Sequence, residues 1–338
     1  MSVSASVAAA WAALSLQAAD PQVDVQAQAA FDAVAQDYPA LNATVMVEGE
    51  MAWQAEGGQA RQPLDGVARD HNFYSIAKML TGLAYIRLEQ DGRMALDTPV
   101  REIDPGLPPA YDGVTLQHLL NHTGGVRHYT SEADWIAFAD RRCAVPADAL
   151  DYFIGDDLTA APGAAFQYST FGYVLLSHLL VEITDAESFD AAMRDVLGEA
   201  YLAHRDHEGA NKATSRVGEP GDWQLYDGMS AECKFGGGGL LASARDLAAM
   251  GTALYRGDIV DPAALAERSP YWVGRAEELD LTYVAHSGGS PGGRAFLLVY
   301  VEPQVSVALT GNYDGPNLQE LAITLADLFA GIPVAGDE

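Results

Sequence analysis

The chain has 338 residues, of which 47 are acidic and 19 are basic, so its formal net charge is −28. A surface of this sign repels a phosphate backbone, which excludes nucleic acid as an expected partner. Hydrophobic residues make up 49% of the chain and charged residues 20%, which is typical of soluble globular proteins. No stretch reaches the ~18 apolar residues that a membrane span needs.

The first segment, residues 1–20, resembles a signal peptide in part. Its Ala-rich apolar core has a suitable length, but a basic start and a clear small-residue cleavage site are missing. We expect either a leader or a frayed helix at 1–20, followed by a single domain at 21–338. A leader favours a periplasmic or secreted location, and a cytoplasmic location stays open.

Helical and strand patterns alternate in the first part of the domain. Residues 23–39 predict a helix, and residues 43–58 predict two strands joined by a short turn. From Ser75 onward, apolar residues recur at helical spacing, and Gly92 is a plausible end for that helix.

The middle of the chain, about 96–225, contains helical patterns and long loops with no convincing strand pair. A turn at Pro162-Gly163 precedes an apolar run from Tyr173 to Ile183, which predicts a helix. Tyr168 therefore falls on a loop just before that helix.

The last third of the chain returns to strands. Ser243 and Asp246 form a capping-box arrangement that opens a predicted helix over 243–257. Strands are predicted at 281–287, 295–301 and 305–311, followed by a final helix at 317–331.

This order predicts an α/β (α+β) fold in which early and late strands share one antiparallel sheet, flanked by the terminal helices. The α/β lobe would comprise about 21–95 and 226–338. A mostly helical lobe at about 96–225 would be inserted into it, and a site between the lobes could draw residues from both.

Ser75 and Lys78 are the first candidate catalytic residues. The chain has three lysines and sixteen arginines, and lysine, unlike arginine, can lose its proton in a protein and act as a base. Residues three apart share a helix face, so Lys78 can approach Ser75. We take Ser75 as nucleophile and Lys78 as base, with a chance S-x-x-K match as the alternative. The base role requires burial or a second cation to favour the neutral amine.

Two further pieces could complete such a site. The hydroxyl of Tyr168 could pass protons between nucleophile and leaving group, although a loop aromatic packed on its neighbours is the simpler interpretation. His286 to Gly293 is a glycine-rich stretch at the end of a strand, where a peptide N–H such as that of Gly289 could pair with that of Ser75 as an oxyanion hole. His286 could be partly protonated near neutral pH.

Residues Gly288–Gly292 also match G-x-S-x-G, the nucleophile elbow of α/β-hydrolases, around Ser290. That motif needs a helix directly after it and a histidine later in the chain. Here Pro291 and a strand follow, and no later histidine occurs. We therefore reject Ser290 as the nucleophile.

The order S-x-x-K, Y-x-T and H-S-G resembles that of the penicillin-recognising serine hydrolases, which include class C β-lactamases, D-Ala-D-Ala carboxypeptidases, D-aminopeptidases and related esterases. The resemblance spans about residues 40–315. The branch that looks most similar is the mitochondrial serine β-lactamase-like protein and its bacterial relatives, on four segments: 116–129, 168–177, 234–257 and 286–299.

The resemblance implies a β-lactamase/DD-peptidase-like fold and assigns the site residues. Ser75 would be the acylated nucleophile, Lys78 its base, and Tyr168 a partner in proton transfer. The substrate-binding positions would be Thr170, where many relatives have asparagine, and His286, Ser287 and Gly288, which replace Lys-Thr-Gly, together with Gly289 at the oxyanion. Neither a cofactor nor a metal is implied.

Two departures from the family pattern bear on the substrate. Thr170 is shorter than asparagine and offers a hydroxyl in place of an amide. His286 is a weaker cation than lysine, which weakens the expected grip on the carboxylate of penicillins. We therefore expect any β-lactamase activity to be weak.

For several other residues we prefer a structural interpretation to a functional one. His122 is expected in the core or at a cap, and His204–His207 in a solvated loop rather than at a metal. Lys234 precedes four glycines near the expected cleft, and a substrate role is its alternative. Arg294 could meet an acidic group of the substrate.

The two cysteines, Cys143 and Cys233, lie ninety residues apart. This spacing indicates neither a disulfide framework nor a zinc site, and their redox state stays open.

The expected function is that of a cofactor-independent serine hydrolase, a peptidase, amidase or esterase, that forms an acyl-enzyme with a small peptide, amide or ester. One alternative is a family esterase of the same mechanism. The other is a non-catalytic binding or assembly module that has kept the fold. The oligomeric state stays open.

Overall fold

The structure is a computed structural model that describes residues 21–59, 69–209, 211–226, 231–269 and 271–334. The expected leader at 1–20 lies outside the described residues. Within the described ranges, no helix has the length and apolar character needed to cross a membrane.

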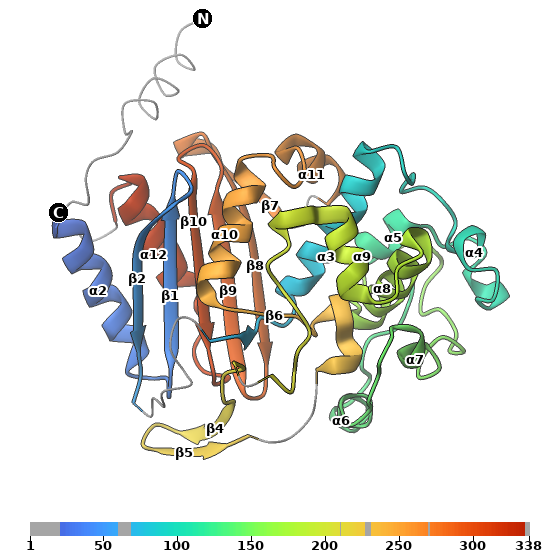
Figure 1. Ribbon diagram of the computed structural model, residues 1–338, viewed down its shortest axis with the longest axis horizontal. Helices are drawn as coiled ribbons and strands as arrows, with labels where there is room; N and C mark the ends of the chain where they lie inside the picture. Colours follow the sequence, from blue (N-terminus) through green and yellow to red (C-terminus); the bar gives the residue numbers. More distant parts are fainter. Residues whose placement is uncertain (1–20, 60–68, 210, 227–230, 270, 335–338) are drawn as a thin grey trace, which may run out of the picture.

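One antiparallel sheet of six strands, in the order β2-β1-β10-β9-β8-β7, forms the centre of the α/β part (Figure 1). Its strands are β1 (Leu41–Val47), β2 (Glu50–Gly57), β7 (Val273–Ala276), β8 (Leu281–Ser290), β9 (Gly293–Tyr300) and β10 (Val305–Gly311). The first strand pairs with the last, with Leu41 opposite Gly311. This confirms the prediction that early and late strands share a sheet, whereas β7 was not predicted.

Helices cover both faces of the sheet because its strands alternate side chains between the faces. Helices α2 (Pro21–Ala35) and α12 (Gln319–Ala330) pack on one face with Phe296 and Leu298. Helix α10 (Ala244–Tyr255) packs on the other face with Leu297 and Val299. The predicted terminal helices are confirmed, although α2 ends at Ala35, before the predicted residue 39.

Helix α3 (Ile76–Gln90) and helix α8 (Thr170–Thr184) run through the core beside the sheet. Every residue from Ile76 to Ile86 is buried, and so is every residue from Thr170 to Leu180. A helix that is apolar all round is expected in such a position. The first turns of these two helices carry the predicted Ser75–Lys78 and Tyr168–Thr170 pairs.

The remaining helices between residues 96 and 225 gather on one side of the sheet (Figure 1). They are α4 (Val100–Ile103), α5 (Leu116–Leu120), α6 (Glu132–Ala139), α7 (Ala147–Leu150) and α9 (Phe189–Leu197), with short 3₁₀ turns η1 (Pro109–Tyr111) and η2 (Gly198–Ala200). The expectation of no strand pair in this region is wrong. A hairpin of β4 (Arg216–Glu219) and β5 (Asp222–Leu225) forms around Pro220-Gly221, a dipeptide that favours a turn.

Short elements connect the two parts of the molecule. Strand β3 (His71–Asn72) pairs with β6 (Leu241–Ala242), just before α3 and α10 respectively. The 3₁₀ segment η3 (Glu232–Gly237) carries Lys234 and part of the glycine run. Helix α11 (Pro262–Arg268) and the turn η4 (Glu277–Leu279) lie around β7.

Cys143 and Cys233 form a disulfide, which the sequence interpretation did not anticipate. Their separation of 90 residues carries no information about distance in space. The loop between α6 and α7 folds back onto η3, and this contact brings the two thiols together.

Candidate active site

Ser75 occupies the position just before α3, and its hydroxyl makes no capping hydrogen bond to that helix. The chain turns sharply here because Tyr74 has a positive φ of 48°, a conformation that non-glycine residues rarely adopt. The Tyr74 N–H donates to Oδ1 of Asn72 at 2.6 Å, which stabilises the turn. The Ser75 hydroxyl is therefore left for other partners.

Lys78 lies one turn further along α3 and is fully buried. Its Nζ is 3.3 Å from Ser75 Oγ and 2.5 Å from the carbonyl oxygen of Gly237. The rings of Tyr168 and Tyr173 lie 4.9 and 5.9 Å from the same nitrogen. In the described part of the chain, no carboxylate forms an ion pair with Lys78.

Tyr168, from the segment just before α8, meets Ser75 at the start of α3. Its hydroxyl donates to Ser75 Oγ at 2.8 Å, so the serine oxygen lies within reach of both proposed proton-transfer groups. The Tyr168 ring packs against His122 at a centroid distance of 4.6 Å and edge-on against His128 at 5.5 Å. These two rings hold the phenol toward the nucleophile.

His122 is a buried support for Tyr168, which agrees with the structural role expected for it. Its Nδ1 accepts from the Ser169 N–H at 3.1 Å, and its Nε2 lies 3.3 Å from the Tyr271 hydroxyl. Burial, assisted by the charge of Lys78, lowers the pKa of His122 to about 3, so the ring is neutral.

Strand β8 brings the predicted substrate-binding stretch, His286–Gly289, close to Ser75. It continues to Ser290, beyond the predicted end at 287, so the His286–Gly289 stretch belongs to the sheet. A side chain at Gly288 would collide with the Phe73 carbonyl, two residues before Ser75. Glycine at this position therefore allows β8 to lie against the turn that carries the nucleophile.

His286 is neutral, which corrects the expectation of partial protonation. Burial is the main cause that lowers its pKa to about 4, and nearby Lys78 acts in the same direction. Its Nδ1 lies 2.6 Å from the carbonyl oxygen of Ser287 and donates to it, because a carbonyl can only accept. His286 therefore presents no positive charge to a substrate at pH 7.

Ser75 opens onto two adjoining cavities. The first, which we call the His286 cavity, has a volume of about 360 Å³ and includes Tyr168, His286, Ser287 and Gly289 in its lining. The second, the Lys234 cavity, has a volume of about 300 Å³. Its lining again includes Tyr168 and Gly289, and adds Thr170, Trp135 and Lys234.

The predicted site residues are thus brought to one cleft. Ser75, Tyr168, Thr170, His286, Ser287 and Gly289 line its walls, Lys78 lies beneath Ser75, and Gly288 supports the wall from behind. The catalytic and binding roles of these residues remain predictions. Arg294 lines the His286 cavity, where its Nε forms an ion pair with Asp314 at 2.9 Å.

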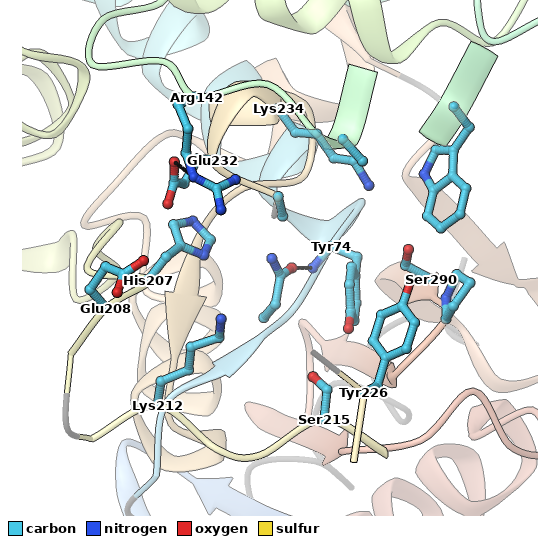
Figure 2. Close-up of a pocket in the computed structure, with 15 residues that line it drawn as sticks. Tyr74, Arg142, His207, Glu208, Lys212, Ser215, Tyr226, Glu232, Lys234 and Ser290 are labelled. Atoms are coloured by element: carbon cyan, nitrogen blue, oxygen red, sulfur yellow. Dashed lines mark hydrogen bonds and ion pairs between the residues drawn. The ribbon is translucent and has the colours of Figure 1, made fainter. Parts of the chain in front are cut away.

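Several cleft residues were missed by sequence reasoning. The sequence around Trp135 on α6 contains no motif that indicates a cleft residue, because only the folding of the helical part brings Trp135 to the cleft. Gly237 could have been suspected from the run of four glycines, and its carbonyl holds Lys78. A third cavity of about 200 Å³, the outer cavity, continues beyond Lys234 (Figure 2).

The histidines grouped at 204–207 have protein partners rather than a solvated setting. His204 Nε2 lies 3.2 Å from Oδ2 of Asp70, and His207 Nε2 lies 2.8 Å from the Gly239 carbonyl oxygen. Within the ranges that the structure covers, no group of three or more His, Cys, Asp or Glu side chains is arranged to hold a metal ion.

Comparison with known proteins adds three findings. A family model described as Beta-lactamase matches residues 25–331. The chain is 25% identical over 287 residues to penicillin-binding protein 4* of Bacillus subtilis (strain 168), and the alignment covers 75% of this chain and 62% of that protein. The chain therefore spans less than two thirds of that relative's length.

Two solved structures share the fold over nearly their whole length. A D-stereospecific amidohydrolase from Streptomyces sp. aligns with a TM-score of 0.73 and 20% identity, covering 92% of this chain and 99% of that one. A D-amino acid amidase from Ochrobactrum anthropi SV3, solved with D-phenylalanine, aligns with a TM-score of 0.74 and 17% identity at the same coverages.

Proposed function

The chain belongs to the Beta-lactamase family, as its resemblance predicted, and we propose that it is a serine hydrolase that cleaves an amide or ester through an acyl-enzyme. The proposed nucleophile is Ser75, with Lys78 and Tyr168 as its proton-transfer partners. No cofactor takes part in this scheme. The amidohydrolase and amidase among the structural relatives indicate that the fold is suited to amide hydrolysis.

One observation carries the proposal. The Ser75 hydroxyl lies 3.3 Å from the Lys78 amine and 2.8 Å from the Tyr168 hydroxyl, and it faces two cavities large enough for a small substrate. A serine needs a base within hydrogen-bond distance to become a nucleophile. An open cleft at that serine argues against the alternative of a non-catalytic binding module.

The mechanism follows from these contacts. Ser75 Oγ attacks the carbonyl carbon as its proton passes to the Lys78–Tyr168 pair, which can accept it only when the Lys78 amine is neutral. The N–H groups of Ser75 and Gly289 bind the oxyanion that forms. The leaving nitrogen or oxygen takes the proton as its bond to carbon breaks. A water molecule then gives a proton to the same pair and attacks the acyl ester, which releases the acid and restores the Ser75 hydroxyl.

Covalent labelling tests the assignment of the nucleophile. A fluorophosphonate probe should add its mass to the native chain at Ser75, and Ser75→Ala should abolish the addition. Ser290→Ala is the matched control, because Ser290 lines the same two cavities but forms no hydrogen bond with Lys78 or Tyr168 among the described residues. It should keep the label. Intact-protein and peptide mass spectrometry reads both results, and labelling elsewhere would contradict the proposal.

An esterase of the same mechanism is the second candidate, and the neutral state of His286 favours it. In the described lining of the His286 cavity, Arg294 is already paired with Asp314, so no free cation awaits the carboxylate of a penicillin. Hydrolysis rates for p-nitrophenyl acetate and butyrate, D-amino-acid amides and nitrocefin would separate the candidates. Rapid nitrocefin turnover would overturn the expectation of weak β-lactamase activity.

A further inference from the structure

The Lys234 cavity holds a positive charge without a balancing acid. Lys234 is 8% exposed, and its Nζ lies 5.6 Å from the centre of the Trp135 ring. Among the residues that the structure describes, no hydrogen bond or ion pair involves this ammonium group, and no aspartate or glutamate lines the cavity. A buried cation is costly unless a counter-charge reaches it. In a chain with 47 acidic residues, this arrangement is unexpected.

The outer cavity does not supply the missing acid. Figure 2 shows Arg142 and Glu232 together on one wall, where their side chains form an ion pair of 3.9 Å. Glu208 and Lys212 line the part of this cavity beyond them. Lys234 extends toward Tyr74 and Ser290, both of which also line the Lys234 cavity (Figure 2).

On the other side of Ser75, the His286 cavity has no comparable charge. His286 is neutral at pH 7, and Arg294 is engaged by Asp314. The position where the family resemblance places a substrate-binding lysine is therefore uncharged. Among the described residues that line these two cavities, the cation without an acidic partner is Lys234.

We propose that Lys234 binds an anionic group of the substrate, such as a carboxylate, in the cavity beside Ser75. This inference rests on the proposed hydrolase function and names a substrate class for it. The walls formed by Tyr74, Tyr129 and Trp135 suit an apolar segment between the reacting carbonyl and the anion. The anion can belong to the acyl part or to the leaving group, because both would extend from Ser75.

The charge of Lys234 is available at neutral pH and is lost above it. Burial, together with the charge of Lys78, lowers the pKa of Lys234 to about 8. Besides Tyr74, Tyr129, Tyr168 and Tyr226, the titratable groups that line its two cavities are His128, Arg142, His207, Glu208, Lys212 and Glu232. His128 and His207 are neutral at pH 7, because burial lowers their pKa to about 4 and about 3.

Matched substrates give the test. p-Nitrophenyl hydrogen adipate and p-nitrophenyl hexanoate share a six-carbon acyl chain, and only the first ends in a carboxylate. 3-Carboxy-4-nitrophenyl hexanoate places the carboxylate in the leaving group instead. The quantity measured is the ratio of kcat/KM for each anionic ester to that for p-nitrophenyl hexanoate, so that general effects on catalysis cancel.

We expect Lys234→Met to lower this ratio by about 10- to 100-fold for one of the two anionic esters, since a charge-assisted hydrogen bond would be lost. The ester whose ratio falls shows whether the bound anion belongs to the acyl part or to the leaving group. Lys234→Arg should keep much of the preference. The native preference should fall as pH rises through about 8, and that of Lys234→Arg should not, because arginine stays protonated.

Two outcomes would overturn the inference. One is an unchanged ratio in Lys234→Met for both anionic esters, and the other is a native preference that does not change with pH. In either case hydrolysis of p-nitrophenyl hexanoate and labelling of Ser75 would leave the proposed function standing. If the proposed hydrolase function itself were wrong, the result would be different: no ester would be hydrolysed and Ser75 would not be acylated.

Discussion

Gly288 shows how closely one residue constrains the site. A Cβ there would meet the Phe73 carbonyl, so Gly288→Ala must displace either β8 or the turn before Ser75. A displacement of about 1 Å can reduce catalysis by roughly 100-fold. We expect kcat/KM for p-nitrophenyl butyrate to fall by about 10- to 100-fold, with the far-UV circular dichroism of the fold retained.

Gly155→Ala is the control for this change. A Cβ at Gly155 would meet no atom within 4 Å, and its backbone has no positive φ that glycine alone accepts. This variant should keep native kinetics. Native activity in Gly288→Ala would show that the contact between β8 and Phe73 does not position the nucleophile.

The predictability of single residues depended on local spacing. Ser75 and Lys78 could be paired because three residues along a helix fix their approach. The charge of His286 could not be predicted, because it depends on burial by segments distant in sequence. For the same reason, Lys234 was recognisable as a rare residue, but its setting beside Trp135 required the folded chain.

At the scale of elements, η3 links the two central helices to the cleft. Its Gly236 N–H donates to Ser177 Oγ of α8 at 3.0 Å, and its Gly237 carbonyl accepts from Lys78 of α3 at 2.5 Å. A side chain at Gly236 would collide with Thr81 of α3. The glycine run thus lets η3 insert between α3 and α8, which explains a motif that sequence analysis could only note.

The disulfide holds this element in place, and its removal should destabilise the protein. Cys143 and Cys233 close a loop of 90 residues, so the bond restricts the unfolded chain considerably. We expect Cys143→Ala with Cys233→Ala to lower the free energy of unfolding by about 2–5 kcal/mol. Urea unfolding followed by fluorescence, with and without dithiothreitol, measures this loss.

Treatment of both proteins with dithiothreitol provides the control for this experiment. Dithiothreitol should lower the urea midpoint of the native chain toward that of the double variant, and it should not affect the double variant itself. Because η3 carries the Gly237 carbonyl, loss of activity should precede global unfolding in the double variant. Equal midpoints for the native and reduced proteins would contradict the role assigned to the bond.

At the scale of the whole molecule, chain order was a good guide to architecture. Patterns at 43–58 and 281–311 predicted strands that meet in one sheet. Alternating and apolar runs can be recognised in the sequence alone, because they do not depend on contacts with distant segments. The β4–β5 hairpin and β7 escaped prediction because both are short and largely exposed or half-buried. The cleft itself depends on where the helical part packs, which local patterns do not encode.

The fold as a whole should lose stability in acid. Protonation of the buried His71 is one cause that can be tested separately. This ring is 3% exposed, its Nε2 lies 3.0 Å from the Asn42 amide, and burial lowers its pKa from 6.5 to about 4. The unfolded state therefore binds the proton more tightly, so the free energy of unfolding should fall as pH drops from 6.5 toward 4. The contribution of His71 is roughly 3 kcal/mol over that range.

Substitutions of two histidines that interact with Asp70 separate this effect from the general response to acid. His71→Gln removes the titration, so its urea midpoint should fall less than that of the native chain between pH 7 and 4.5. His204→Gln should make the urea midpoint fall more over the same range, because the hydrogen bond that His204 donates to Asp70 raises the pKa of His204 and stabilises the fold below that pKa. Parallel pH profiles for the native chain and both variants would contradict this assignment, because they would mean that neither histidine changes its proton affinity on folding.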